Sequence, residues 1–140
     1  MTFIFLSASF FQDYANCPEI EQKANRPYIC TYIEVNGISF AIPLRSHINH
    51  PHVLWTDKEN HCGLDFSKTV VLTKPSYIDA NKKPHIRQNE FDALRGKDYL
   101  IQQRLLKYIS AYKKAKERLD VPRNQILCSC STLQYFESYI

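Results

Sequence analysis

The sequence predicts an α+β fold in one domain. Its length of 140 residues, with 44% apolar and 23% charged residues, is typical of a single globular domain. Two apolar runs with alternating character, separated by Asn36-Gly37, predict a β-hairpin. Between Asp98 and Leu119 apolar residues recur at helical spacing, which predicts one long amphipathic helix in the C-terminal half.

The N-terminal residues are expected to form a strand and a short helix. The opening MTFIFLSASFF is as apolar as a signal peptide, but it lacks a basic n-region and polar residues follow it at once, which favours a first strand. Ser9 is a suitable N-cap for a short helix over residues 10–16, which Pro18 would end. Residues 19–26 are expected to be a further helical turn or a loop.

The two-residue turn determines which residues of the hairpin strands face each other. Val35 must lie opposite Ile38, and the same count places Cys30 opposite Pro43. That pair falls at a non-hydrogen-bonded site, so the hairpin does not need the N–H that proline lacks. Beyond the apolar positions the register pairs polar ends of the two segments: Tyr28 with Arg45, Pro27 with Ser46, and Arg26 with His47.

The remaining elements follow in order. Residues 50–65 are expected to be a loop and Phe66–Thr73 a third strand. Residues 74–95 are interrupted by two prolines and rich in Lys and Arg. Pro122 is expected to end the long helix. The last stretch, ILCSCSTLQYFESYI, is expected to be a strand followed by a short helical turn.

Charge and cysteine content limit the classes of protein. The net charge of +4 weakly favours an anionic partner, and the placement of the charges matters more than their total. The five cysteines are odd in number and scattered, which does not indicate a disulfide framework but reduced thiols in the cytoplasm. No run approaches the ~18 apolar residues of a membrane span, so no membrane association is expected.

Two chemical alternatives come from the histidine-rich region. Its potential metal ligands are His47, His50, His52, His61 and Cys62. Zinc requires three or four converging ligands, and a paired Cys-x-x-Cys is lacking, so surface histidines in a loop are the commoner explanation. Cys62 beside His61 could instead be a nucleophile, but catalytic partners usually come from distant segments. We therefore expect no metal and no cofactor.

A nucleic-acid surface is a third possibility. Its basic members are Arg26, Arg45, Lys68, Lys74, Lys82, Lys83 and Arg87, interleaved with Tyr28, Tyr32, Phe66 and Tyr77. Basic side chains bind phosphate, and aromatic rings stack on unpaired bases. The alternative is a solvated charged surface over a core in which the tyrosines pack, and the spacing alone favours neither.

Acid–base chemistry on phosphate is the fourth possibility. Cleavage of RNA without a metal needs a base for the 2′-hydroxyl, an acid for the leaving 5′-oxygen and a fixed cation that stabilises the added charge. Arg26 and Arg45 suit the third task, because an arginine with a pKa above ~12 cannot act as a base. Histidine suits either proton task. Ser46 could donate a hydrogen bond to phosphate, or be an ordinary turn residue.

The order of several motifs resembles one family. RPY, NG, FAIPLRS, Ile-x-His, GLDFSK and VVL follow one another as in the type III toxin–antitoxin endoribonucleases. The likeness is closest to their TenpIN branch, with ToxN and AbiQ as more distant relatives. It is strongest over residues 25–75 and extends more loosely to the long helix. It implies a strongly twisted antiparallel sheet, akin to the SH3-like barrel of the Kid and MazF toxins, surrounded by helices.

The resemblance also implies an activity and partners. The activity would be metal-independent cleavage of substrate RNA that leaves a 2′,3′-cyclic phosphate and a 5′-hydroxyl. The inhibitor would be a structured repeat antitoxin RNA, expected to be a pseudoknot, which closes with the toxin into a cyclic hetero-oligomer. The setting would be the bacterial cytoplasm, in plasmid maintenance or in abortive defence against phage.

Site residues carry over position by position. A lysine of the ToxN branch corresponds to Arg26, and its Thr-Ser pair corresponds to Arg45 and Ser46. Its next lysine falls on Ile48, which cannot do that work, and the Ile-x-His pattern offers His50 instead. The expected catalytic residues are Arg26, Arg45, Ser46, His50 and Lys68. The expected RNA-binding residues are Tyr28, Ser67, Lys74, Lys82, Lys83, His85 and Arg87, together with the exposed side of the long helix. The alternatives are a non-catalytic RNA-binding module and, less favoured, a zinc-binding protein.

Overall fold

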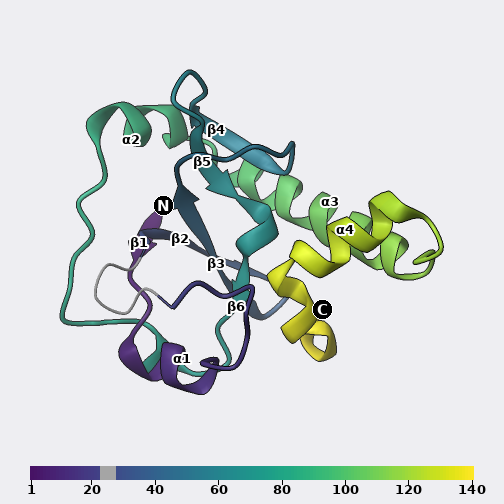
Figure 1. The fold of residues 1–140 in the computed structure, drawn as a ribbon. Helices are drawn as coiled ribbons and strands as arrows, with labels where there is room; N and C mark the ends of the chain where they lie inside the picture. Colours follow the sequence, from purple (N-terminus) through teal and green to yellow (C-terminus); the bar gives the residue numbers. More distant parts are fainter. Residues whose placement is uncertain (23–27) are drawn as a thin grey trace.

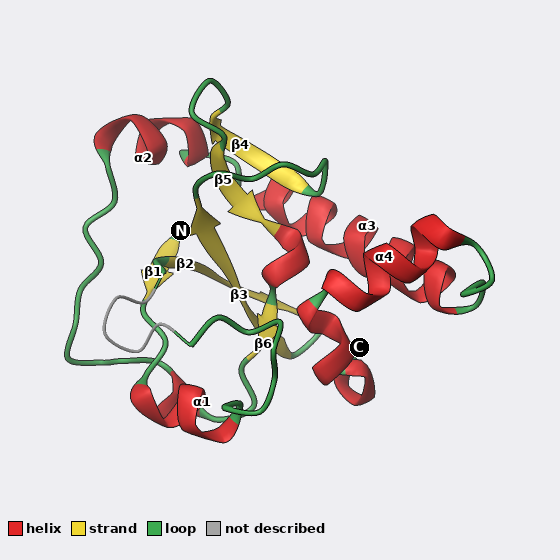
Figure 2. Ribbon diagram, viewed as in Figure 1, coloured by secondary structure: helices red, strands yellow, loops and turns green. Residues whose placement is uncertain are grey.

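The computed structural model describes residues 1–22 and 28–140 (Figure 1). In these ranges the protein is α+β, with a six-stranded antiparallel sheet and four α-helices (Figure 2). The strands are β1 Thr2–Ile4, β2 Cys30–Val35, β3 Ile38–Arg45, β4 Val53–Asp57, β5 Cys62–Asp65 and β6 Val70–Val71. The helices are α1 Ala8–Asp13, α2 Gln88–Leu94, α3 Asp98–Lys116 and α4 Pro122–Cys130. Short 3-10 turns are η1 Phe66–Lys68, η2 Pro75–Tyr77, η3 Thr132–Tyr135 and η4 Glu137–Tyr139.

The central strand is β3, which pairs with β2 along one edge. Its other edge is shared by two strands: β6 pairs at Phe40 and Ala41, and β5 pairs at Leu44 and Arg45. The strand order is β1-β2-β3-β5-β4, with β6 beside β3. Among the described strands, β1 and β4 lie at opposite ends and the sheet does not close. The expected antiparallel sheet with helices around it is present, and it is open.

The hairpin has the predicted register. Val35 lies opposite Ile38 and Cys30 lies opposite Pro43. The turn residues Asn36 and Gly37 have φ of 53° and 77°, as a type I′ turn requires. The backbone N–H of Leu44 donates to the carbonyl of Ile29 at 2.8 Å, so the ladder continues past Pro43, where no N–H is needed. The first-strand prediction is also confirmed, because β1 pairs with β2.

The loop predicted for residues 50–65 is wrong, because this segment contains the β4–β5 hairpin. All four residues of β5 are buried, including the charged Asp65. A strand buried on both faces has no alternation of apolar and polar residues, so the period-two signal is absent. The apolar run of β4 is also short and follows His50, Pro51 and His52, so it was not recognised as a strand.

The third strand predicted for Phe66–Thr73 is wrong in extent. The segment begins with the 3-10 turn η1, and only Val70–Val71 pair with β3. The side chain of Asp65 accepts a hydrogen bond from the backbone N–H of Ser67 at 3.0 Å. This side-chain cap turns the chain out of the extended conformation.

Several helix boundaries differ from the prediction, among them the end of α1, which is at Asp13 rather than near residue 16. The short helix α1 begins at Ala8, after Ser7, rather than at Phe10 after Ser9. The long helix α3 begins at Asp98 as predicted and ends at Lys116. The prediction that Pro122 ends the long helix is wrong, because α3 has already ended at Lys116. Pro122 is instead the first residue of α4, a position that suits proline.

The predicted C-terminal strand is wrong, because ILCSC belongs to α4. In this stretch Ile126 remains 64% exposed and Cys128 is buried, so the apolar residues do not form a buried strand. The predicted helical turn after it is present as η3, and Leu133 and Phe136 are buried as expected.

The core lies between the sheet and α3. The apolar stripe predicted on this helix is buried at Ile101, Leu105, Tyr108, Ile109 and Tyr112. Leu119, the last member of the predicted stripe, lies beyond the helix and is 41% exposed. In the views of Figures 1 and 2, α3 and α4 lie side by side and α2 lies beside β4. None of the described helices combines the length and apolarity that a membrane crossing requires.

Candidate functional site

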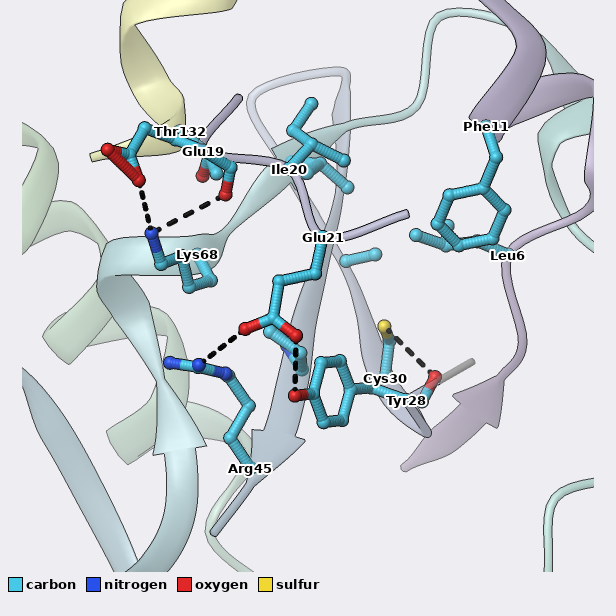
Figure 3. Close-up of a pocket in the computed structure, with 13 residues that line it drawn as sticks. Leu6, Phe11, Glu19, Ile20, Glu21, Tyr28, Cys30, Arg45, Lys68 and Thr132 are labelled. Atoms are coloured by element: carbon cyan, nitrogen blue, oxygen red, sulfur yellow. Dashed lines mark hydrogen bonds and ion pairs between the residues drawn. The ribbon is translucent and has the colours of Figure 1, made fainter. Parts of the chain in front are cut away.

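Arg45 is the last residue of β3, where the strand pairs with β5. This pairing brings the end of β5 close to the guanidinium, whose Nη1 donates to Asp65 Oδ2 at 2.6 Å. Nη2 donates to Glu21 Oε1 at 2.7 Å, and the guanidinium lies 5.6 Å from the ring centroid of Tyr28 (Figure 3). Burial opposes the charge on Arg45, but the hydrogen bonds to Asp65 and Tyr28 and the negative charges of Asp65 and Glu21 together outweigh it and hold the pKa of Arg45 above its usual value.

Asp65 connects Arg45 with His50. The carboxylate is fully buried and uses its second oxygen, Oδ1, for three contacts. It accepts the backbone N–H of Ser67 at 3.0 Å and the Ser67 hydroxyl at 2.6 Å, and it lies 3.1 Å from His50 Nε2. Burial alone would raise the pKa of Asp65, but hydrogen bonds from His50, Ser67 and Arg45 outweigh it and lower this pKa to about 2. The carboxylate is therefore ionised at neutral pH.

His50 has both ring nitrogens engaged inside the protein. Nδ1 accepts the backbone N–H of His52 at 3.1 Å, so the neutral ring carries its proton on Nε2. Nε2 faces Asp65 and lies 3.2 Å from the hydroxyl of Ser67. A proton can reach Nδ1 only when the bond to the His52 backbone opens. Burial and the neighbouring His50 also lower the pKa of His52, which favours its neutral form.

Ser46 follows Arg45 and is exposed. It lines a shallow pocket with Tyr28, Arg45 and Arg87. Sequence reasoning assigned all four to phosphate or RNA contact, and they come from three separate segments: the start of the first hairpin strand, the end of β3 and the residue before α2. His50 is not among the residues that line this pocket, and its link to the pocket is through Asp65 and Arg45.

Lys68 belongs to η1 and faces a second pocket, which also contains Arg45 and Tyr28 (Figure 3). Its Nζ lies 3.1 Å from a carboxylate oxygen of Glu19 and 3.0 Å from the backbone carbonyl of Cys130. The two expected cations, Arg45 and Lys68, are therefore brought to one cavity. Its wall is otherwise largely apolar, with Leu6, Phe11, Ile20, Cys30, Ala41, Pro43 and Val70 among the lining residues.

The other described residues that were expected to contact RNA do not line either of these pockets. Arg26 lies outside the described residues. Ser67 is buried, and its hydroxyl holds Asp65 rather than facing solvent. Lys74 is exposed, and its Nζ lies 3.5 Å from Asp13 Oδ2. The remaining basic residues, Lys82, Lys83 and His85, are exposed along the segment that connects η2 to α2.

The two alternative chemistries were a zinc site in the histidine-rich region and a nucleophilic Cys62. Within residues 1–22 and 28–140, no three His, Cys, Asp or Glu side chains are grouped so that they could hold a metal ion. Cys62 is buried, and burial raises the pKa of its thiol, which makes it a poor nucleophile. The adjacent His61 turns away, with its Nδ1 3.1 Å from the carbonyl of Ile48.

Four acidic residues of the site were not predicted: Asp65, Glu19, Glu21 and Glu90, the last of which lines the pocket of Ser46. One signal existed for Asp65, because a charged residue between Leu64 and Phe66 interrupts an apolar run, and a buried charge needs a partner. No local pattern marks Glu19 and Glu21, since the cations they pair with are 49 and 24 positions away. Glu21 also accepts a hydrogen bond from the Tyr28 hydroxyl at 2.8 Å.

The chain was compared with protein-family models, with curated proteins and with solved structures, and none matches it. The order of motifs in the sequence and the geometry of the pockets are thus what support a function.

Proposed function

We propose that this protein is a metal-independent endoribonuclease, the toxin of a type III toxin–antitoxin system. The observation that carries the proposal is the gathering of Tyr28, Arg45, Ser46 and Arg87 around one pocket at the end of the hairpin. Such a pocket offers phosphate two cations and a hydroxyl, with an aromatic ring and the carboxylate of Glu90 beside them. His50, joined to Arg45 through Asp65, supplies a group that can carry a proton.

In the proposed reaction the 2′-hydroxyl attacks the neighbouring phosphorus and the 5′-oxygen leaves. Ser46 donates a hydrogen bond to a non-bridging oxygen, and Arg45 opposes the charge that develops on it. Asp65 keeps the guanidinium in place, since it binds the side of Arg45 that faces the interior. His50 transfers a proton after its Nδ1 is released from the backbone of His52. Arg26 and Lys68 are proposed as further cations near the phosphate.

The proposal extends to partners and setting. Lys74, Lys82, Lys83, His85 and Arg87, with the exposed side of α3, would bind a structured repeat antitoxin RNA that is a pseudoknot. Toxin and RNA would close into a cyclic assembly in the bacterial cytoplasm. The open sheet would be a variant of the SH3-like barrel found in the Kid and MazF toxins.

The test combines toxicity with analysis of RNA ends. Expression in bacteria should arrest growth, and cut RNA should carry 2′,3′-cyclic phosphate ends. Ser46→Ala and His50→Ala should each reduce cleavage about 10²-fold or more, because each removes a group that acts on the reacting phosphate. Ser138→Ala, an exposed serine near the C-terminus, is the matched control and should arrest growth as the parent does.

Urea unfolding of the His50 variant separates loss of activity from loss of structure, because His50 also contacts the buried Asp65. If folded Ser46→Ala and His50→Ala proteins cut RNA at the parental rate, the proposed site is wrong.

A non-catalytic RNA-binding module is the second candidate. It is favoured by the internal contacts of the site: both ring nitrogens of His50 are engaged, and both Nη atoms of Arg45 bind carboxylates. Both candidates predict RNA binding that weakens steeply with salt. Only the nuclease produces cyclic-phosphate ends, so binding without any cut product would select the second candidate.

A further inference from the structure

Each cation of the pocket in Figure 3 pairs with the carboxylate of a glutamate. Glu19 pairs with Lys68 at 3.1 Å, and Glu21 pairs with Arg45 at 2.7 Å. The carboxylate side chains are 35% and 34% exposed, whereas the two cationic side chains are 18% and 20% exposed. The carboxylate side chains are therefore more accessible to solvent than the two cationic side chains.

Each cation also has a second partner that is not one of these glutamate carboxylates: a buried one for Arg45 and an exposed backbone carbonyl for Lys68. Arg45 Nη1 binds the fully buried Asp65, and Lys68 Nζ lies 3.0 Å from the carbonyl of Cys130. If both outer carboxylates turned aside, the two cations would keep their positions and present one open side each. A site held in this way is preorganised for another anion.

The backbone that carries the two glutamates is held by contacts that do not involve their carboxylates. Ile20, between them, is buried, and the backbone N–H of Glu19 donates to the Tyr135 hydroxyl at 3.2 Å. Side-chain rotation can therefore move the carboxylates while the backbone stays in place, provided that the Glu21 carboxylate also leaves the Tyr28 hydroxyl, which donates to its Oε2 at 2.8 Å. Partly exposed ion pairs of this kind contribute little net free energy, so an incoming anion can replace them at low cost.

We propose that Glu19 and Glu21 occupy the positions that two neighbouring phosphates of single-stranded RNA take when it binds. The RNA backbone would exchange with the two carboxylates on Lys68 and Arg45, and Tyr28, whose ring lies beside Arg45, would contact a base. The glutamates thus act as internal competitors of the RNA phosphates. The choice of RNA as the ligand rests on the proposed function.

The test measures binding without cleavage. The probe is a fluorescent 2′-O-methyl oligouridylate, which lacks the attacking hydroxyl, and the readout is fluorescence anisotropy at fixed salt. Glu19→Gln combined with Glu21→Gln should bind about fivefold more tightly than the parent, because both competitors are neutral. Glu34→Gln combined with Glu59→Gln changes two exposed glutamates elsewhere, and should change the affinity by less than about twofold.

If both double variants gained the same affinity for the oligouridylate, net charge alone would explain the gain, and the inference would be overturned. Unchanged or weaker binding of the Glu19 and Glu21 double variant would overturn it as well.

Circular dichroism and urea unfolding check the fold of the variants. If the double variant does not fold, the two single variants replace it, and each is expected to give part of the gain in affinity. A parent that binds and never cuts RNA would contradict the nuclease and leave this inference standing, whereas cleavage without the gain would contradict this inference alone.

Discussion

At the residue scale, Asp65 organises the site. It is a fully buried carboxylate that binds Arg45 with one oxygen and Ser67 and His50 with the other. A buried charge without partners is strongly unfavourable, so the folded state requires these side chains to be present together. One residue thus fixes the orientation of two groups that the sequence marked separately as phosphate-binding and proton-carrying.

The stability of the protein should therefore depend on acid through Asp65. Its folded pKa of about 2 lies below the ordinary 3.8, so its contribution is complete above pH 3.8 and is lost as the pH falls toward 2. This contribution is about 2 kcal/mol of the free energy of unfolding. Asp65→Asn should lower that free energy by about 2–4 kcal/mol at pH 7. The difference from the parent should shrink between pH 4 and 2 in urea titrations.

Asp92→Asn is the control, because Asp92 is an exposed residue of α2 that pairs with Arg95. This variant should keep the acid-dependent loss of the parent. If Asp65→Asn and Asp92→Asn lose stability in parallel below pH 4, Asp65 is not the source of the acid sensitivity.

At the scale of elements, the site depends on the close approach of β4 to β5. Gly63 lies opposite Arg45 on one side of β5 and opposite Trp55 on the other. A Cβ at this position would lie 2.5 Å from the carbonyl oxygen of Leu54 and 3.0 Å from the Cα of Trp55. These are backbone atoms, which cannot move aside without disturbing the strand pair.

Gly63→Ala should lower the free energy of unfolding by about 2–3 kcal/mol, because the added methyl group forces the two strands apart. The measurement is urea unfolding followed by circular dichroism. Gly37→Asn is the contrasting variant, since its Cβ meets nothing within 4 Å and asparagine tolerates φ of +77°. It should cost less than about 1 kcal/mol, and an equal cost for both variants would contradict the steric explanation.

The elements also differ in how far they could be predicted. The register of the β2–β3 hairpin was predicted to the residue, because the Asn36-Gly37 turn sets it and both strands alternate. The β4–β5 hairpin was missed, since β5 is buried on both faces and shows no alternation. The ILCSC stretch was assigned to a strand although it forms α4, because short apolar runs do not separate the two structures.

At the scale of the whole molecule, aromatic rings join the two ends of the described chain. Phe10 and Tyr14 lie 4.8 Å apart between ring centroids, and Tyr14 lies 5.2 Å from Phe136. Tyr77 adds an edge contact to Phe10 at 5.3 Å. The C-terminal turns therefore close the core against α1, more than a hundred residues away in sequence.

Phe136→Ala should lower the free energy of unfolding by about 3–5 kcal/mol, because Phe136 is fully buried and its removal leaves a cavity. Urea unfolding provides the measurement. Tyr139→Ala removes an aromatic ring that is 49% exposed and should cost less than about 1 kcal/mol. Similar costs for the two variants would show that the C-terminal turns do not complete the core.

The site was predictable in its basic and hydroxyl groups and not in its acidic ones. Hairpin register alone placed Tyr28 near Arg45 and put Ser46 at the end of β3, and these residues share a pocket. Arg87 joins that pocket from a segment whose position the sequence did not indicate. The carboxylates that pair with the cations come from distant segments, and nothing local predicts such pairs.

The sequence by itself determined what short-range chemistry decides: an α+β composition of elements, the register of one hairpin and the start and buried stripe of the long helix. Turn geometry and periodicity act over a few residues, so they can be read from the chain. Only the tertiary structure decided which carboxylate meets which cation, that β3 shares one edge between β5 and β6, and that the sheet stays open. These features depend on contacts between distant segments, whose free energy is set by burial and by the pairing of buried charges.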